Sequence, residues 1–262
     1  MKYDYSYLIT LQFLGFRFHG WQKQTNAKTL HEMIDKTLDF VFDADQIYKS
    51  IGVGRTDAKV SASKFAIQLF VKKPIDEATF LERFNYNAPA DFGALKVVKT
   101  ATSFNIIQAS KLKEYHYYFS FGGKTHPFAA PFLVGLPETL DIDVMIQGAK
   151  LFEGEHYFHK YCTKPSEKTI FKRTIDLCEI VENTILEANF FPEKTYVLKV
   201  RGKGFLRYQI RLMMGVLFEL GRGTVDLAFI KGSLRENNDR LYLPTIAPAS
   251  GLQLYDLSFD LG

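Results

Sequence analysis

The stretch YSYLITLQFLGFRF, residues 5–18, alternates apolar and polar side chains through Tyr7, Ile9, Leu11 and Phe13. This period of two is typical of a strand with one face in the core, because successive side chains of a strand point to opposite faces. The next patterned stretch, TLHEMIDKTL at residues 29–38, has its apolar positions at helical spacing and a capping-box pattern at its start. The chain therefore opens with a strand followed by a helix.

The remaining patterned stretches continue this alternation of strands and helices. The first series predicts strands at 46–53, 63–71 and 95–98 and a helix at 75–86, in the order β-α-β-β-α-β. The second series predicts strands at 115–121, 174–181, 184–189, 196–200 and 252–259, with helices at 142–152 and 206–221. Sheets with helices gathered on one face give an α+β fold. We divide the chain into halves at 1–110 and 111–262, and expect the proline-containing stretch 122–137 to be a linker.

The composition is that of an ordinary globular chain. Its 262 residues are 47% hydrophobic, and no run of about 18 apolar residues occurs, so we expect no membrane span. The 33 Lys and Arg residues against 29 Asp and Glu give a net charge of +4, so a surface for a polyanion would have to come from local clustering. Cys162 and Cys178 are the only cysteines and lack CxxC spacing, which favours a reducing cytoplasm.

The stretch GVGRTDAKVSA, residues 52–62, contains the first candidate catalytic group. It places Asp57 just after a predicted strand, among turn-forming residues and two residues from Arg55. A carboxylate next to a guanidinium stays ionised, and an ionised carboxylate can act as a nucleophile or a base. An Arg and an Asp two apart in a turn also commonly form a simple local ion pair, so this motif needs support from elsewhere in the chain.

The strongest cluster of basic residues lies in residues 199–222. It contains one acid, Glu219, and the basic residues Lys199, Arg201, Lys203, Arg207, Arg211 and Arg222. In the helix predicted at 206–221, Arg207 and Arg211 lie four apart and about 100° round from the apolar stripe, at the margin of the core. Solvated or ion-paired arginines are the alternative interpretation. The neighbouring Gly202 and Gly204 argue against that alternative, because small residues let a phosphate or base approach the backbone.

Aromatic residues provide a third feature. The segment KEYHYYFSF, residues 113–121, is rich in tyrosine; most of it should be core, but one tyrosine at a cleft could stack on a pyrimidine. The single tryptophan, Trp21, is expected to pack in the core, with Lys23 and Gln24 beside it as candidate phosphate contacts.

Metal and cofactor signatures are missing from the sequence. The one close histidine pair, His156 and His159, has no cysteine or acidic residue at ligand spacing except Glu155, so we predict no metal. The chain has no Walker loop, no GxGxxG after a strand and no GxSxG elbow, so we predict no cofactor.

Several motifs, in order along nearly the whole chain, resemble those of the tRNA pseudouridine synthase A family. GRTDA at residues 54–58 is similar to the family's catalytic motif, and GWQKQ at 20–24 is similar to its GWQxQ. NYNAP at 85–89 resembles the N-x-N-x-P stretch, and KEYHYYF at 113–119 the tyrosine motif. FLRYQIRLMMG at 205–215 resembles the F-x-R-x-x-x-R-x-x-x-G helix, and SGLQL at 250–254 the closing G-L-x-L.

The resemblance implies a fold, a reaction and partners. The implied fold is two RRM-like (ferredoxin-like) α+β halves with antiparallel sheets around a central basic cleft. The implied protein is a cytoplasmic homodimer that acts on tRNA without a cofactor. It is an isomerase, an intramolecular transferase, and converts uridine to pseudouridine in the anticodon stem-loop at positions 38 to 40 or nearby.

The resemblance also assigns roles to single residues. Asp57 would be the catalytic aspartate, Tyr115 the tyrosine that stacks on the target base, and Arg211 the arginine that pairs with the aspartate. The expected RNA contacts are Arg55, Lys59, Arg207, Lys23, Gln24 and Lys203. The family usually reads GRTDAGVHA, whereas this chain has Lys59 for the glycine and Ser61 for the histidine, which indicates a divergent member.

Two alternative functions share either the proposed chemistry or the proposed binding of RNA. The same chemistry could act on another RNA such as ribosomal RNA, or the chain could be a non-catalytic RNA-binding protein. A carboxylate-based glycosidase fits less well, because that chemistry usually needs two carboxylates at the scissile bond and only Asp57 is placed by a motif.

Overall fold

The fold was analysed in a computed structural model that describes residues 3–236, 243 and 245–259. Contacts between residues divide the chain into two compact units. The first unit comprises Met1–Lys111 and Leu254–Gly262, and the second comprises Leu112–Gln253. The end of the chain therefore belongs to the same unit as its beginning.

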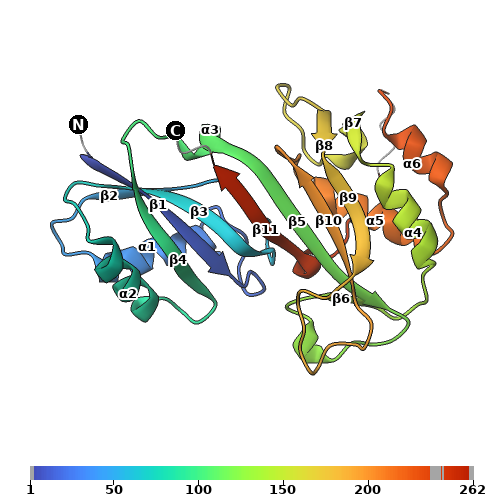
Figure 1. Ribbon diagram of the computed structural model, residues 1–262, viewed down its shortest axis with the longest axis horizontal. Helices are drawn as coiled ribbons and strands as arrows, with labels where there is room; N and C mark the ends of the chain where they lie inside the picture. Colours follow the sequence, from blue (N-terminus) through green and yellow to red (C-terminus); the bar gives the residue numbers. More distant parts are fainter. Residues whose placement is uncertain (1–2, 237–242, 244, 260–262) are drawn as a thin grey trace. The chain divides into compact units, whose positions relative to one another are not determined.

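The first unit has the predicted order β-α-β-β-α-β, followed by a short helix and the last strand of the chain (Figure 1). Its elements are β1 (Tyr5–Phe13), α1 (Leu30–Val41), β2 (Tyr48–Gly52), β3 (Ser61–Val71), α2 (Glu77–Asn87), β4 (Phe92–Thr100), α3 (Ile106–Ala109) and β11 (Leu252–Phe259). The strand order is β4-β1-β3-β11, and β2 also pairs with β3. The pairs of β1 with β3, β1 with β4 and β2 with β3 are antiparallel, as predicted.

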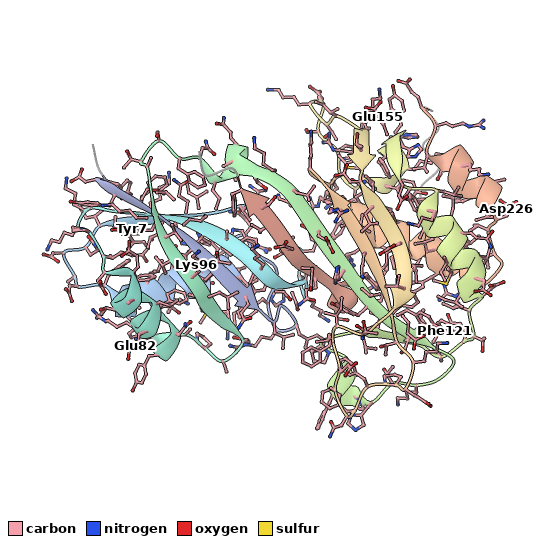
Figure 2. All side chains as sticks on the ribbon, in the orientation of Figure 1. Tyr7, Glu82, Lys96, Phe121, Glu155 and Asp226 are labelled. Carbon is pink, nitrogen blue, oxygen red and sulfur yellow. The ribbon has the colours of Figure 1, made fainter. Side chains whose placement is uncertain are left out.

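The core of the first unit covers both faces of β1, which the alternating pattern had predicted to be half-buried. Ile9 and Leu11 are fully buried, and Ser6 on the other face is equally inaccessible. The Ser6 hydroxyl bonds with Thr100 Oγ1 at 2.8 Å and accepts from Gln68 Nε2 at 3.0 Å, which satisfies a polar group inside the sheet. Tyr7, labelled in Figure 2, is buried, and its hydroxyl accepts from the backbone N–H of Ile75 at 3.2 Å.

Helix α1 begins after Thr29, as the capping-box pattern predicted, but the Thr29 side chain makes no cap hydrogen bond. Within the described part of the chain, the Thr29 hydroxyl is buried and has no hydrogen-bond partner. The Glu32 carboxylate accepts from Lys36 Nζ at 2.6 Å, and this neighbour is the main cause of its lowered pKa.

The second unit is again a mixture of antiparallel sheet and helices, as Figure 1 shows. Its elements are β5 (Ser110–Phe121), β6 (Val134–Leu136), α4 (Ile142–Lys150), β7 (Gly154–Tyr157), β8 (Lys172–Ile175), β9 (Leu177–Glu182), β10 (Tyr196–Gly202), α5 (Gln209–Gly221) and α6 (Leu227–Ser233). The sheet runs β5-β10-β9 with antiparallel pairs, β6 adds to β5 in parallel, and β7 with β8 forms a separate pair. Helix α4 contacts both β9 and α5, so these helices cover one face of the sheet. No helix in the described residues is long and apolar enough to cross a membrane.

Two predictions for the second unit were wrong, and three of its elements, β6, β7 and α6, were not predicted. Residues 184–189, all described, form no strand, because the Asn183 side chain accepts from the backbone N–H groups of Ile185 and Leu186 and turns the chain. The stretch 122–137 is no linker, since it lies within the unit and pairs with β5 through β6. Helix α6, which begins at the N-cap Asp226 labelled in Figure 2, had not been predicted.

Candidate active site

The loop between β2 and β3 carries Asp57 in the first unit. Val53 and Thr56 are buried and anchor the loop, and the Val53 N–H donates to Ala66 O of β3 at 2.9 Å. The Val60 N–H donates to Asp57 O at 3.2 Å and closes a turn. The Asp57 side chain is half-buried between these anchors, so the loop holds its carboxylate at the surface on a rigid backbone.

A second segment, residues 15–21, packs directly against this loop. The Trp21 N–H donates to Thr56 O at 3.1 Å, and Phe18 O accepts from the Lys59 N–H at 3.0 Å. Gly20 has a φ of +88°, and a Cβ built on it would lie 2.6 Å from Thr56 O. Only glycine fits there, because the backbones of the two segments touch at the residue before Asp57.

The two departures from the family motif have structural explanations. Lys59 has a φ of +67°, the left-handed conformation that glycine adopts without strain, so the backbone here suits the glycine of the motif. Its exposed side chain extends over the ring of Phe16, with Nζ 5.6 Å from the ring centroid. Ser61 accepts from the Gly15 N–H at 3.0 Å, so it ties the loop to the same neighbouring segment.

The other candidate RNA contacts of the first unit lie near this loop in sequence or structure. Arg55 is exposed, two residues before Asp57. Lys23 forms an ion pair with Asp35, and the Gln24 side-chain amide donates to His19 O at 3.0 Å. The side chains of Lys23 and Gln24 are therefore held by local contacts on the surface.

The second unit brings Arg207 and Arg211 together over one aromatic ring. The Arg207 and Arg211 Cζ atoms lie 5.4 Å and 4.8 Å from the Tyr208 ring centroid. Helix α5 begins at Gln209, so the helical-wheel argument for Arg207 was wrong, although both guanidinium groups lie near the Tyr208 ring. Tyr208 is the N-cap with φ 63° and ψ 8°, so a left-handed residue separates Arg207 from the helix that carries Arg211.

Arg211 is fixed by the segment that precedes the last strand. Its Nε donates to Ala247 O at 2.8 Å, and the Ala247 N–H donates to Arg211 O at 3.0 Å. The next carbonyl, Pro248 O, accepts from the buried Tyr117 hydroxyl at 2.8 Å. Burial raises the pKa of Tyr117, and the nearby positive charge of Arg211 acts in the opposite direction. The Arg211 side chain is thus only partly exposed and has a fixed orientation.

Tyr115, the predicted stacking residue, lies on β5 of the second unit. It is half-buried, and its ring contacts that of Phe205 edge to face, with centroids 5.4 Å apart and an interplanar angle of 88°. Phe205 and the exposed Lys203 belong to the turn between β10 and α5. The tyrosine strand and the start of the arginine helix therefore meet within one unit, while Asp57 belongs to the other unit.

Several residues of the site were not predicted from sequence. Tyr208 and Phe205 lie inside the arginine motif, and their aromatic character was the available signal. Ala247 had no signal at all, since its backbone rather than its side chain holds Arg211. Gly215 matches the last glycine of the motif, and a Cβ on it would overlap Thr245 O, so it allows the segment to lie against α5.

The close histidine pair, His156 and His159, belongs to the second unit. His156 lies on β7, and its ring bonds to Glu153 O at 2.8 Å. Among residues 3–236, 243 and 245–259, no three His, Cys, Asp or Glu side chains group closely enough to hold a metal ion.

These residues supply the elements for chemistry on RNA. A half-buried carboxylate can attack or deprotonate a substrate, arginines can bind phosphate, and a tyrosine can stack on a base.

Comparison with known proteins identifies the family. A family described as tRNA pseudouridine synthase matches residues 149–260. The chain is 30% identical over 250 residues to tRNA pseudouridine synthase A of Exiguobacterium sibiricum, covering 95% of each chain. It is 30% identical over 252 residues to the protein of that name from Fervidobacterium nodosum, covering 96% of this chain and 98% of the relative. Similarity of this extent shows that the chain belongs to the tRNA pseudouridine synthase A family.

Proposed function

We propose that this chain converts uridine to pseudouridine in the anticodon stem-loop of tRNA, at positions 38 to 40 or nearby. As a member of the family it is an isomerase that acts on tRNA. The observation that carries the proposal is the half-buried carboxylate of Asp57, held on a loop that is hydrogen-bonded on both sides. Such an anchored carboxylate suits a catalytic role better than a mobile surface ion pair does.

We assign the chemical step to Asp57. The reaction breaks the bond between ribose C1′ and uracil N1, turns the base and forms a bond from C1′ to C5, and C5 then loses a proton to N1. An ionised carboxylate can promote this sequence by attacking the nucleotide or by removing the proton, and it is regenerated in either case.

Binding of the target nucleotide is assigned mainly to the second unit. Tyr115 would stack on the displaced base, which offsets part of the few kcal/mol that base extrusion costs. Arg211 would pair with the catalytic carboxylate, and its fixed guanidinium offers planar, bidentate geometry for this task. Arg207, Lys203, Arg55, Lys59, Lys23 and Gln24 would contact the phosphate backbone.

Other features implied by the family resemblance stay predictions. These are the RRM-like character of the two halves, the basic cleft, the homodimer and the cytoplasmic location. Light scattering of the purified protein, alone and with tRNA, measures whether it is a dimer.

The chemical assignment is tested with Asp57→Ala. We expect turnover of anticodon stem-loop RNA to fall by at least about a thousandfold, while the dissociation constant for the RNA changes little, because only the chemical step needs the carboxylate. Asp45→Asn is the matched control, since Asp45 is an exposed carboxylate of the same unit that pairs with Lys73. Normal turnover by Asp57→Ala would refute the assignment.

The substrate is tested by pseudouridine mapping with carbodiimide labelling in cells with and without the gene. Loss of the modification at anticodon-arm uridines supports the proposal. Loss of the modification in ribosomal RNA instead would support the proposed reaction but assign it to a different RNA substrate. An unchanged map would favour a non-catalytic RNA-binding protein.

A further inference from the structure

A chain of side-chain hydrogen bonds joins α1 to β2, the strand that leads into the Asp57 loop. The Ser50 hydroxyl donates to Asp35 Oδ1 at 2.6 Å and lies 2.8 Å from His31 Nε2. Because Ser50 has one hydroxyl proton and gives it to Asp35, His31 Nε2 must carry the proton of the second bond. Asp35 also pairs with Lys23 at the surface. We call Asp35, Ser50 and His31 the brace.

The imidazole of the brace supports Trp21. The His31 and Trp21 rings are stacked with centroids 5.0 Å apart and an interplanar angle of 14°. The Phe65 ring also contacts Trp21, at a centroid distance of 4.4 Å, and Trp21 is only 3% exposed. Burial lowers the pKa of His31, so the stacked ring is neutral at pH 7, and its orientation is set by Ser50.

Trp21 in turn contacts the loop that carries Asp57 at two points, both before the aspartate. Its indole lies against Gly52 at the end of β2, where an added Cβ would come within 2.5 Å of the ring. Its backbone N–H donates to Thr56 O at 3.1 Å, and its own carbonyl accepts from the His31 N–H at 3.1 Å. A shift of Trp21 would therefore disturb Gly52 and Thr56, which both precede Asp57 in the chain.

The same three residue types occur in serine hydrolases, but the hydrogen bonds here run in the wrong direction. A nucleophilic serine donates its proton to histidine, whereas Ser50 donates to Asp35 and is itself buried. The cluster therefore cannot activate Ser50, which leaves a supporting role.

We propose that the brace positions the catalytic loop, so that Asp35, Ser50 and His31 act through Trp21 to fix the Asp57 carboxylate. They are positioning residues, and the inference rests on the proposed role of Asp57. A displacement of about 1 Å in a catalytic group can cost about a hundredfold in rate, so loosening this support should be visible in the chemical step.

The test uses Ser50→Ala, with Ser6→Ala as the matched control. Ser6 is also a buried serine with two side-chain hydrogen bonds in the same unit, but its partners are Thr100 and Gln68, away from the loop. For each variant we would measure the single-turnover rate with saturating enzyme on anticodon stem-loop RNA, the dissociation constant for that RNA, and the folded fraction by circular dichroism.

We expect Ser50→Ala to lower the single-turnover rate by about tenfold or more, with RNA affinity within about twofold of the parent. Ser6→Ala should keep the parental rate at a similar loss of stability. Ser50→Thr, which keeps the hydroxyl, should restore most of the rate. His31→Gln is the second variant, because it can still donate to Ser50 but cannot stack on Trp21, and it should also be slow.

Parental rates in both Ser50→Ala and His31→Gln would overturn the inference, as would an equal slowing by Ser6→Ala. Asp57→Ala measured in parallel separates the two proposals. If Asp57→Ala is inactive while the brace variants have the parental rate, only the positioning proposal is refuted. If Asp57→Ala turns over normally, the catalytic assignment itself fails.

Discussion

Gly20→Ala tests the contact between the two backbones that meet beside Asp57. A Cβ at position 20 would lie 2.6 Å from Thr56 O and 3.1 Å from Asp57 C, both backbone atoms that cannot rotate away. The left-handed φ of +88° adds about 1–2 kcal/mol for a residue with a Cβ. Relief of the overlap by backbone movement costs about 1–3 kcal/mol more, so we expect a total loss of about 2–5 kcal/mol.

The control for this prediction is Gly122→Ala. Gly122 has nearly the same φ, +86°, but an added Cβ meets no atom within 4 Å among the described residues. It should therefore lose only the conformational contribution of about 1–2 kcal/mol. Urea unfolding gives both free energies, and single-turnover kinetics on anticodon stem-loop RNA reports the position of Asp57.

We expect Gly20→Ala to be less stable than Gly122→Ala by about 1–3 kcal/mol and to be slower in the chemical step by about tenfold or more. Gly122→Ala should keep the parental rate. Equal stabilities and equal rates for the two variants would show that the close approach of residues 15–21 does not position the catalytic loop.

Two further predictions concern charged groups. Arg211→Lys keeps the positive charge but loses the Nε donor to Ala247 O. We therefore expect turnover to fall by about tenfold or more, with the affinity for RNA little changed. An unchanged rate constant would contradict a role for the geometry of the guanidinium group. Because burial lowers the pKa of His31 in the folded chain, the unfolded chain binds a proton near pH 6.5 that the folded chain does not. The stability from neutral His31 is therefore present above about pH 6.5 and is lost as the pH falls through the lower folded pKa. Urea midpoints between pH 7.5 and 5 should decline less steeply in His31→Gln, and parallel curves would count against this linkage.

Local patterns predicted most elements of the first unit. The period-two and helical patterns gave the order β-α-β-β-α-β, because each element buries one consistent set of side chains. The prediction failed at residues 184–189, where apolar content suggested a strand. There the Asn183 side chain binds the backbone of Ile185 and Leu186, a competition that strand propensity does not describe.

The sequence named the candidate site residues but did not give all of their positions, because local backbone conformation is not visible in spacing. Residue types and motif order singled out Asp57, Tyr115 and Arg211, whose roles stay predictions. The position of Arg207 was misjudged, because a left-handed Tyr208 delays the helix and the wheel angle no longer applies. Spacing along the chain describes a regular helix but not the conformation of the residue that starts it.

The sequence alone determined the family, the order of most elements and the residue types available for chemistry. These depend on side-chain identity and on periods of two and of about 3.6 residues, which can be read directly along the chain. Only the tertiary structure decided which backbones touch. Gly20 against Thr56, Trp21 against Gly52 and Ala247 against Arg211 join residues far apart in sequence. The physical reason is that hydrogen bonding and close packing act between neighbours in space, and distant segments become neighbours only once the chain is folded.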